Sequence, residues 1–462
     1  MRGPVWSKAL LVGLALAVSV VATGCGQSKA HKASAAEPDR TMAQLERIVR
    51  SRVVSGRLPG IVAGMVFPDG STRVVAYGDA GRGKRLDAHS VFEIGSITKV
   101  FTASVLSDMV RRGQVKLTDP VARLLPPGVS VPSRDGRQIT LLDLATHSSG
   151  LPRDATNLPS KDPEKPYAGY TAARLYAFLE GYHLPRVPGS RVEYSNLGEG
   201  LLGHALALHA GTSYEQLVRA RILDPLHMTS SGIGLSADQA RHVLTGHDAE
   251  GTVVPPFEMG VLAGAGSLRS TIGDMLRFAA ANLDRGGGRL QHAMANTHAP
   301  RKRFDANQIG LNWIITHGIV WHNGGTSGFS SFIGLDPARH TAIVVLSNSR
   351  AEMVDDIGFH MLDHRMPLTP APTTINLPRH ALARYVGLYT AAGTTARITL
   401  SARGLTLRLG TTTARLYAQT KTAFLVKRLM AAIDIRLDVN GKVTGLVFHD
   451  ANGKTYVAKR VQ

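Results

Sequence analysis

Strand-type patterns lie near both ends of the first 365 residues, and helical patterns occupy the chain between them. The β-rich runs 61–67 and 72–77 flank Asp69-Gly70, a dipeptide typical of a tight hairpin. A short strand is predicted at 91–94, and the others come much later, at 311–316, 320–322, 331–335 and 342–346. Apolar residues at helical spacing predict helices at 42–53, 96–112, 141–147, 171–181, 197–209, 214–222, 270–283 and 351–364. This order predicts an α+β domain over 41–366, whose sheet is completed by distant parts of the chain around a helical insertion.

The remaining chain predicts a second, smaller domain. The 462 residues exceed one typical folding unit, so two or three units are expected. A proline-rich stretch over 367–378 is typical of a moderately stiff linker. Beyond it, 379–462 contains short alternating runs and the turn dipeptides Asn440-Gly441 and Asn452-Gly453. These features favour a small all-β domain.

The N-terminal residues have the layout of an export signal, predicted over 1–24. Two basic residues, Arg2 and Lys8, precede an apolar run over 9–21 that is too short to span a bilayer. Small residues then precede Cys25, as in a bacterial lipobox. We therefore expect a lipid on Cys25, a flexible tether over 25–40, and a location in the cell envelope or periplasm. The alternative is an ordinary secretory signal with an incidental cysteine.

Composition limits the possible partners and cofactors. Cys25 is the only cysteine, which excludes an internal disulfide framework and a thiolate zinc site. The net charge of +19 raises nucleic acid as a partner. However, the longest basic run is Arg301-Lys302-Arg303, and aromatic residues make up only 6% of the chain. We expect no nucleic-acid partner, and membrane contact only through the N-terminal lipid.

The sequence Ser-x-x-Lys occurs once, as Ser96-Ile97-Thr98-Lys99, at the start of the predicted helix 96–112. Residues i and i+3 share one face of a helix, so Lys99 can reach Ser96. A serine hydroxyl becomes a good nucleophile when a base removes its proton, and a desolvated lysine can be that base. By itself, this tetrapeptide fits a helix-capping serine and a solvated lysine better than a catalytic pair.

A second motif, Tyr194-Ser195-Asn196, precedes the predicted helix 197–209. A nearby ammonium favours the phenolate form of a tyrosine, so Tyr194 could take the Ser96 proton and return it to a leaving group. Asn196 could orient Lys99 and bind a substrate amide. The alternative is a buried tyrosine beside a capping asparagine.

A third motif follows a predicted strand, and contains His322, Asn323, Gly324 and Gly325. A glycine pair allows a ligand to approach the backbone closely. The N–H groups of Gly325 and Ser96 could then form an oxyanion hole, with His322 as a titratable group beside the substrate. The alternative is a tight turn between strands that carries an ordinary polar histidine.

In this order and setting, the three motifs resemble the serine β-lactamase and penicillin-binding-protein superfamily. The branch they resemble comprises class C β-lactamases, D-alanyl-D-alanine carboxypeptidases and family VIII esterases. The resemblance covers 45–365 and includes the stretches 139–152, 222–228 and 266–271. It implies an antiparallel sheet with flanking helices and a helical insertion. The tail from 379 is similar to the lipocalin-like β domain that often follows such proteins.

The resemblance implies a role for each motif residue: Ser96 as the acylated nucleophile, Lys99 as its partner, Tyr194 as the general acid and base, and Asn196 as the amide-orienting residue. Two positions depart from the common pattern. His322 lies where many members have lysine, and Asn323 lies where threonine or serine is common. A histidine is largely neutral at pH 7, so we expect a weaker dependence on a substrate carboxylate than a true β-lactamase shows.

The sequence therefore predicts an exported serine hydrolase that acts on a peptidoglycan-like peptide, an ester or a β-lactam through an acyl-serine intermediate. The competing hypothesis is a catalytically silent envelope protein that binds or scaffolds and keeps the fold. No metal or cofactor is implied. The G-x-G-x-x-G at 198–203 lies within a helical pattern, and His360 and His364 lack the glutamate of a metalloprotease motif.

Overall fold

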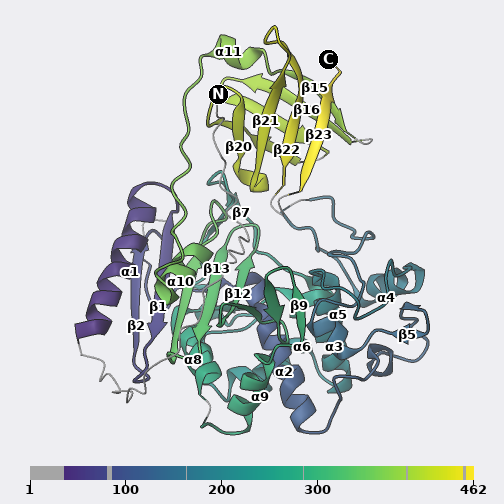
Figure 1. Ribbon diagram of the computed structural model, residues 1–462. Coiled ribbons are helices and arrows are strands. Elements are labelled where there is room, and N and C mark those ends of the chain that lie inside the picture. The colour runs from purple at the N-terminus through teal and green to yellow at the C-terminus, as the bar shows by residue number, and fades with distance from the viewer. Residues whose placement is uncertain are drawn as a thin grey trace, which may run out of the picture.

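The computed structural model describes residues 36–80, 86–162, 164–284, 286–391, 394–410, 412–450 and 454–461. The predicted signal peptide, Cys25, the tether before residue 36 and the Asn452-Gly453 turn lie outside the described residues. Figure 1 shows a mixed α/β domain, a linker along one side of it, and an all-β domain above it. The linker, 367–378, contains neither helix nor strand.

An antiparallel sheet with the strand order β2-β1-β14-β13-β12-β11-β10-β9 forms the centre of the mixed domain. The first strand pairs with the last, from Ile61 opposite Ser347 to Val66 opposite Ala342. The prediction of a sheet completed by distant parts of the chain is therefore confirmed. The strands are β1 (Gly60–Val66), β2 (Thr72–Gly78), β9 (Lys302–Phe304), β10 (Asn307–Ile309), β11 (Ile314–Thr316), β12 (Ile319–Gly325), β13 (Ser330–Asp336) and β14 (Thr341–Ser347).

Helices cover both faces of this sheet, because its central strands are apolar on both sides. On β14, Ile343 and Val345 enter one hydrophobic cluster, whereas Val344 and Leu346 enter the other. This is the alternation expected of a strand. The first cluster is closed by α1 (Ala36–Val54) and α10 (Asp355–Leu362), and the second by the helices of the insertion.

The insertion supplies most of the helices and carries the site. Its helical elements are η1 (Gly95–Ile97), α2 (Thr98–Arg111), η2 (Val121–Leu124), α3 (Leu141–Ala145), α4 (Ala172–Gly181), α5 (Asn196–His209), α6 (Tyr214–Val218), η3 (Arg219–Leu223), α7 (Ala237–Ala240), η4 (Gly260–Ala265), α8 (Ile272–Leu283) and α9 (Arg289–Thr297). Its short strand pairs are β3 (Phe92–Glu93) with β8 (Arg269–Ser270), β4 (Ser133–Arg134) with β5 (Arg137–Gln138), and β6 (Gly246–His247) with β7 (Val253–Val254).

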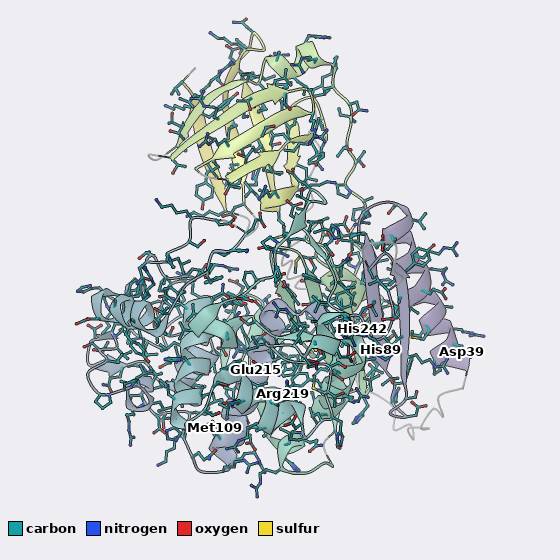
Figure 2. The ribbon with its side chains drawn as sticks, turned by 180° about the vertical axis from the view of Figure 1, so that it is seen from behind. Asp39, His89, Met109, Glu215, Arg219 and His242 are labelled. Carbon is teal, nitrogen blue, oxygen red and sulfur yellow. The ribbon has the colours of Figure 1, made fainter. Side chains whose placement is uncertain are left out.

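The predicted tether is wrong over residues 36–40, because α1 already begins at Ala36. Pro38 is tolerated there, since the N–H groups of the first helical turn have no intrahelical acceptor. Asp39, labelled in Figure 2, pairs with Arg73 on β2 and ties this end of the helix to the sheet. Further along α1, Leu45 and Val49 are buried against the sheet.

The C-terminal domain is a nine-stranded antiparallel sheet, and its predicted all-β class is confirmed. Its edge strands, β18 and β19, are separated by Leu416 alone, so the sheet curls into a nearly closed barrel. Tyr389, Phe424 and Ile433 lie in its separate core. The elements are α11 (Arg379–Ala383), β15 (Gly387–Ala391), β16 (Thr394–Ser401), β17 (Gly404–Leu409), β18 (Thr412–Arg415), β19 (Tyr417–Ala418), β20 (Ala423–Val426), η5 (Lys427–Leu429), β21 (Ala431–Leu437), β22 (Val443–His449) and β23 (Thr455–Arg460).

Over the described residues, none of the helices combines the length and the apolar character needed to cross a bilayer.

Candidate active site

Ser96 lies in the tight turn η1, immediately before α2. Gly95 adopts a φ of +50°, a conformation that favours glycine. A Cβ atom at this position would also lie 2.8 Å from the backbone nitrogen of Gly325. The glycine therefore allows the turn that carries Ser96 to pack directly against the end of β12.

Lys99 is fully buried on the first turn of α2, which rules out the interpretation of a solvated lysine. Its Nζ donates to Ser96 Oγ at 3.0 Å, to Asn196 Oδ1 at 2.9 Å and to the carbonyl oxygen of Ala265 at 2.6 Å. These contacts occupy the three N–H groups of an ammonium. Lys99 is thus held as a donor that points at the serine oxygen.

Tyr194 reaches Ser96 from the segment before α5, and its hydroxyl lies 2.7 Å from Ser96 Oγ. The ring also lies close to positive charge. Lys99 Nζ is 4.8 Å and Arg153 Cζ is 5.1 Å from its centroid. The structure therefore brings Ser96, Lys99 and Tyr194 within hydrogen-bond reach of one another.

Asn196 is the first residue of α5, and both ends of its amide are engaged. Its Oδ1 accepts from Lys99, while its Nδ2 donates to Asp154 Oδ1 at 3.1 Å and lies 3.1 Å from the hydroxyl of Tyr167. The capping role belongs instead to Ser195, whose side chain accepts from Gly198 N. Asn196 therefore fixes the orientation of Lys99.

His322 lies on β12, with its ring centroid 6.5 Å from that of Tyr194. Its Nδ1 is 2.6 Å from the carbonyl oxygen of Asn323, and Nε2 has no hydrogen-bond partner among the described residues. Burial, together with the positive charge of Lys99, lowers the pKa of His322 to about 3. The imidazole is consequently neutral at pH 7, so it brings no positive charge to the site.

Asn323 points to the opposite face of the sheet, as alternation along β12 requires. Its Nδ2 donates to Asp355 Oδ2 at 2.5 Å, at the start of α10. Burial raises the pKa of Asp355 to about 7. The structure thus does not bring the Asn323 side chain to the group around Ser96.

The glycine pair allows two close contacts at the end of β12. A Cβ at Gly324 would lie 2.0 Å from the carbonyl oxygen of Ile94, and a Cβ at Gly325 would lie 2.7 Å from Nη1 of Arg350. The first contact fixes β12 against the chain just before Ser96. The second places the guanidinium of Arg350 beside the backbone of Gly325.

Comparison with known proteins agrees with this geometry. The sequence model of the Beta-lactamase family matches residues 45–365, most of the chain. The chain belongs to the Beta-lactamase family. The resemblance drawn from the three motifs is therefore confirmed.

Relatives of this Beta-lactamase-family chain include a carboxypeptidase/endopeptidase and a second bacterial protein. The D-alanyl-D-alanine-carboxypeptidase/endopeptidase AmpH of Escherichia coli (strain K12) is 32% identical over 308 residues, covering 62% of this chain and 79% of that protein. Protein flp of Staphylococcus aureus (strain N315) is 25% identical over 331 residues, covering 69% of this chain and 65% of that protein.

Solved structures show the same Beta-lactamase fold. The D-alanine carboxypeptidase AmpC from Burkholderia cenocepacia matches with a TM-score of 0.62 and 24% identity, over 71% of this chain and 100% of that one. A class C β-lactamase matches with a TM-score of 0.63 and 22% identity, over 73% of this chain and 100% of that one.

Two buried residues of this Beta-lactamase site were not predicted from the sequence. The ring of His147 packs at a tilt against Tyr194 with centroids 4.4 Å apart, and burial and Lys99 lower the pKa of His147 well below 6.5. Glu199, one turn after Asn196 on α5, is fully buried, and burial raises its pKa to about 8. An acidic residue within the apolar pattern of 197–209 was the only signal in the sequence for Glu199.

Proposed function

We propose that this chain is a serine hydrolase that cleaves an ester or amide through an acyl group carried on Ser96. The observation that carries the proposal is the convergence of Tyr194 Oη and Lys99 Nζ on one serine oxygen, at 2.7 and 3.0 Å. General-base catalysis needs this hydrogen-bond distance between the base and the proton it removes. The family membership and relatives that are carboxypeptidases support the same chemistry.

In the proposed first step, Ser96 Oγ bonds to the substrate carbonyl carbon while its proton passes to the phenolate oxygen of Tyr194, the form of a tyrosine that can accept a proton. Lys99 Nζ lies 3.0 Å from the same oxygen and is held there by Asn196 Oδ1 and the carbonyl oxygen of Ala265. The bond to the leaving group then breaks, and Tyr194 returns the proton to the departing oxygen or nitrogen. Water attacks the acyl-serine through the same base, which releases the acid and restores Ser96.

The developing oxyanion is proposed to bind the backbone N–H groups of Ser96 and Gly325. The close packing of Gly95 against Gly325 supports this, because it brings these two backbone segments together. Fixed donors of this kind act where negative charge forms in the transition state.

For substrates, we propose short peptides of the D-alanyl-D-alanine type, esters or β-lactams, with a weak dependence on a substrate carboxylate. The neutral imidazole of His322 supports the weak dependence, since it offers no charge to an anion.

We also propose that the chain is exported to the cell envelope and anchored by a lipid on Cys25. The basic, apolar and small-residue order before Cys25 supports this. Metabolic labelling with a palmitate analogue tests it, with Cys25→Ser as the control. Equal labelling of wild type and variant would count against lipidation.

The hydrolase proposal is tested with an active-site-directed phosphonate, whose adduct is located by peptide mass spectrometry. The label is expected on Ser96 in the wild type and is expected to disappear in Ser96→Ala. Ser104→Ala is the matched control, because Ser104 is another buried serine on α2. A wild type that takes up no label and turns over no ester would favour the silent binding protein instead.

A further inference from the structure

Among the described residues, two polar contacts join the C-terminal domain to the mixed domain. Arg428, in η5, forms an ion pair with Glu164, and both side chains are partly exposed. The backbone N–H of Arg415, at the end of β18, donates to Glu250 Oε1 at 2.8 Å. Figure 1 shows the β domain seated above β7, the strand that follows Glu250.

The first of these contacts joins the wall of the active site. The carbonyl oxygen of Glu164 accepts from Ser327 Oγ at 3.1 Å, and Ser327 follows Gly325 by two residues. Three residues after Glu164, the hydroxyl of Tyr167 contacts Asn196, which in turn holds Lys99. Arg428 therefore holds a segment, 164–167, that contacts Ser327 just beyond β12 at one end and the amide of Asn196 at the other.

The second contact leads to the same turn. Glu250 lies between β6 and β7. This strand pair packs closely on Gly328, the residue after Ser327, because a Cβ atom at Gly328 would lie 2.6 Å from Val254 Cγ2. Both contacts of the C-terminal domain therefore bear on the β12–β13 turn, directly beyond Gly325. The C-terminal domain is therefore tied to the two segments that pack against this turn.

Opposite charges face each other across this contact. On the C-terminal domain, Arg415 Cζ and Lys427 Nζ lie 5.0 and 4.8 Å from the ring centroid of Tyr417. Burial raises the pKa of Tyr417, and the negative charges of Glu250 and Asp248 raise it further, so the acidic side lies within electrostatic range. Attraction between these charged groups is expected to weaken as salt is added.

We propose that the C-terminal β domain limits the size of the acyl donor that reaches Ser96. Arg428 sets this limit by holding Glu164 against Ser327 of the β12–β13 turn, and these two residues are called the rim here. This inference rests on the proposed hydrolase function and adds a substrate class, namely small or short acyl donors. Arg428 is a specificity-determining residue here, because it contacts the wall of the site and not the reacting atoms.

The test compares p-nitrophenyl esters that share one leaving group and differ in the acyl group, from acetyl to a tetrapeptidyl group. Arg428→Glu places two carboxylates in contact and should loosen the rim. The ratio of kcat/KM for the tetrapeptidyl ester to that for the acetyl ester should rise about fivefold, the effect of one partly exposed ion pair. Turnover of the acetyl ester should stay at the wild-type value.

Two variants separate this effect from a loss of structure. The charge swap Glu164→Arg with Arg428→Glu restores the pair and should return the ratio to the wild-type value. Arg436→Glu is the matched control and should change nothing. Arg436 is an exposed arginine near the far end of β21, the strand that leads away from η5.

Salt gives an independent measurement. Raising the ionic strength from 0.1 to 1 M shortens the screening length from about 10 to about 3 Å, so the wild-type ratio should rise toward that of Arg428→Glu. The proposal is overturned if the wild type hydrolyses the acetyl ester but Arg428→Glu shows the same ratio. If the wild type hydrolyses neither ester and Ser96 takes up no phosphonate, the hydrolase function itself fails, and this inference fails with it.

Discussion

The hydroxyl of Tyr194 lies 2.7 Å from Ser96 Oγ, although the two residues are 98 positions apart in the chain. Lys99 contacts the same oxygen, but its remaining N–H groups are bound to Asn196 and Ala265. We propose different tasks for the two groups on this geometry: Tyr194 moves the proton, and Lys99 holds Ser96 Oγ in position.

Removing the phenol oxygen tests this division. Tyr194→Phe should lower kcat by about 100- to 10,000-fold, the usual range for a general base, with little change in KM. Steady-state hydrolysis of p-nitrophenyl acetate measures it, and circular dichroism checks folding. A kcat within tenfold of the wild type would show that Lys99 is the base.

Charge at position 322 should control the preference for anionic substrates. In His322→Lys, an ammonium replaces a neutral imidazole, so the kcat/KM ratio of the carboxylate-bearing nitrocefin to a neutral ester should rise about tenfold, the effect of one charge-assisted hydrogen bond. Sites are counted by phosphonate titration to correct for misfolded protein. His322→Asn is the neutral control and should leave the ratio unchanged. An unchanged ratio in His322→Lys as well would contradict this role for the position.

The close contact at Gly324 should make it intolerant of a side chain. A Cβ would lie 2.0 Å from the carbonyl oxygen of Ile94, so β12 or the turn before Ser96 must move. We expect Gly324→Ala to lower the free energy of unfolding by about 1–3 kcal/mol and to reduce kcat. Thermal unfolding and ester turnover measure the two effects.

Gly273→Ala is the control for this substitution. Gly273 lies in α8, where the nearest atom to an added Cβ is 3.9 Å away. Alanine should stabilise the helix slightly there, by up to about 1 kcal/mol. If Gly324→Ala and Gly273→Ala had equal free energies of unfolding, β12 and the turn that carries Ser96 could move apart with little loss of stability.

Glu199 should make stability depend on pH. The pKa of Glu199 is about 8 in the folded chain, whereas that of an ordinary glutamate is 4.5. Between pH 4.5 and pH 8 the Glu199 carboxyl is therefore protonated in the folded state and ionised in the unfolded state. This contribution to stability is present below pH 4.5 and is lost as the pH rises to about 8. Glu199→Gln lacks the proton equilibrium, so its stability relative to the wild type should increase from pH 5 to pH 9.

Urea unfolding followed by tryptophan fluorescence measures this difference in the mixed domain, which contains both described tryptophans, Trp313 and Trp321. Glu46→Gln is the control, because Glu46 is exposed on α1. If the difference in unfolding free energy between Glu199→Gln and the wild type were the same at all pH values, ionisation of Glu199 would not be the source of the pH dependence.

Most elements of the mixed domain follow local patterns, and the sequence placed them within a few residues. The hairpin of β1 and β2 forms around Asp69-Gly70, as the turn dipeptide predicts. The helix expected from 42 begins at Ala36, and α9, β9 and β10 were not expected. Two other boundaries differ for local reasons. The strand expected from 311 begins at Ile314, because Asn312 adopts a φ of +60°. The helix expected from 351 begins at Asp355, after non-helical Val354.

The sequence by itself determined the family, the three motifs and the pairing of distant strands, because these depend on residue identity, spacing and apolar periodicity. Only the tertiary structure decided that His322 faces Tyr194 while Asn323 faces α10, since strand register fixes which side chains share a face. It also decided the burial of His147 and Glu199 and the docking of Arg428 on Glu164. These depend on packing between segments far apart in the chain, which local patterns do not encode.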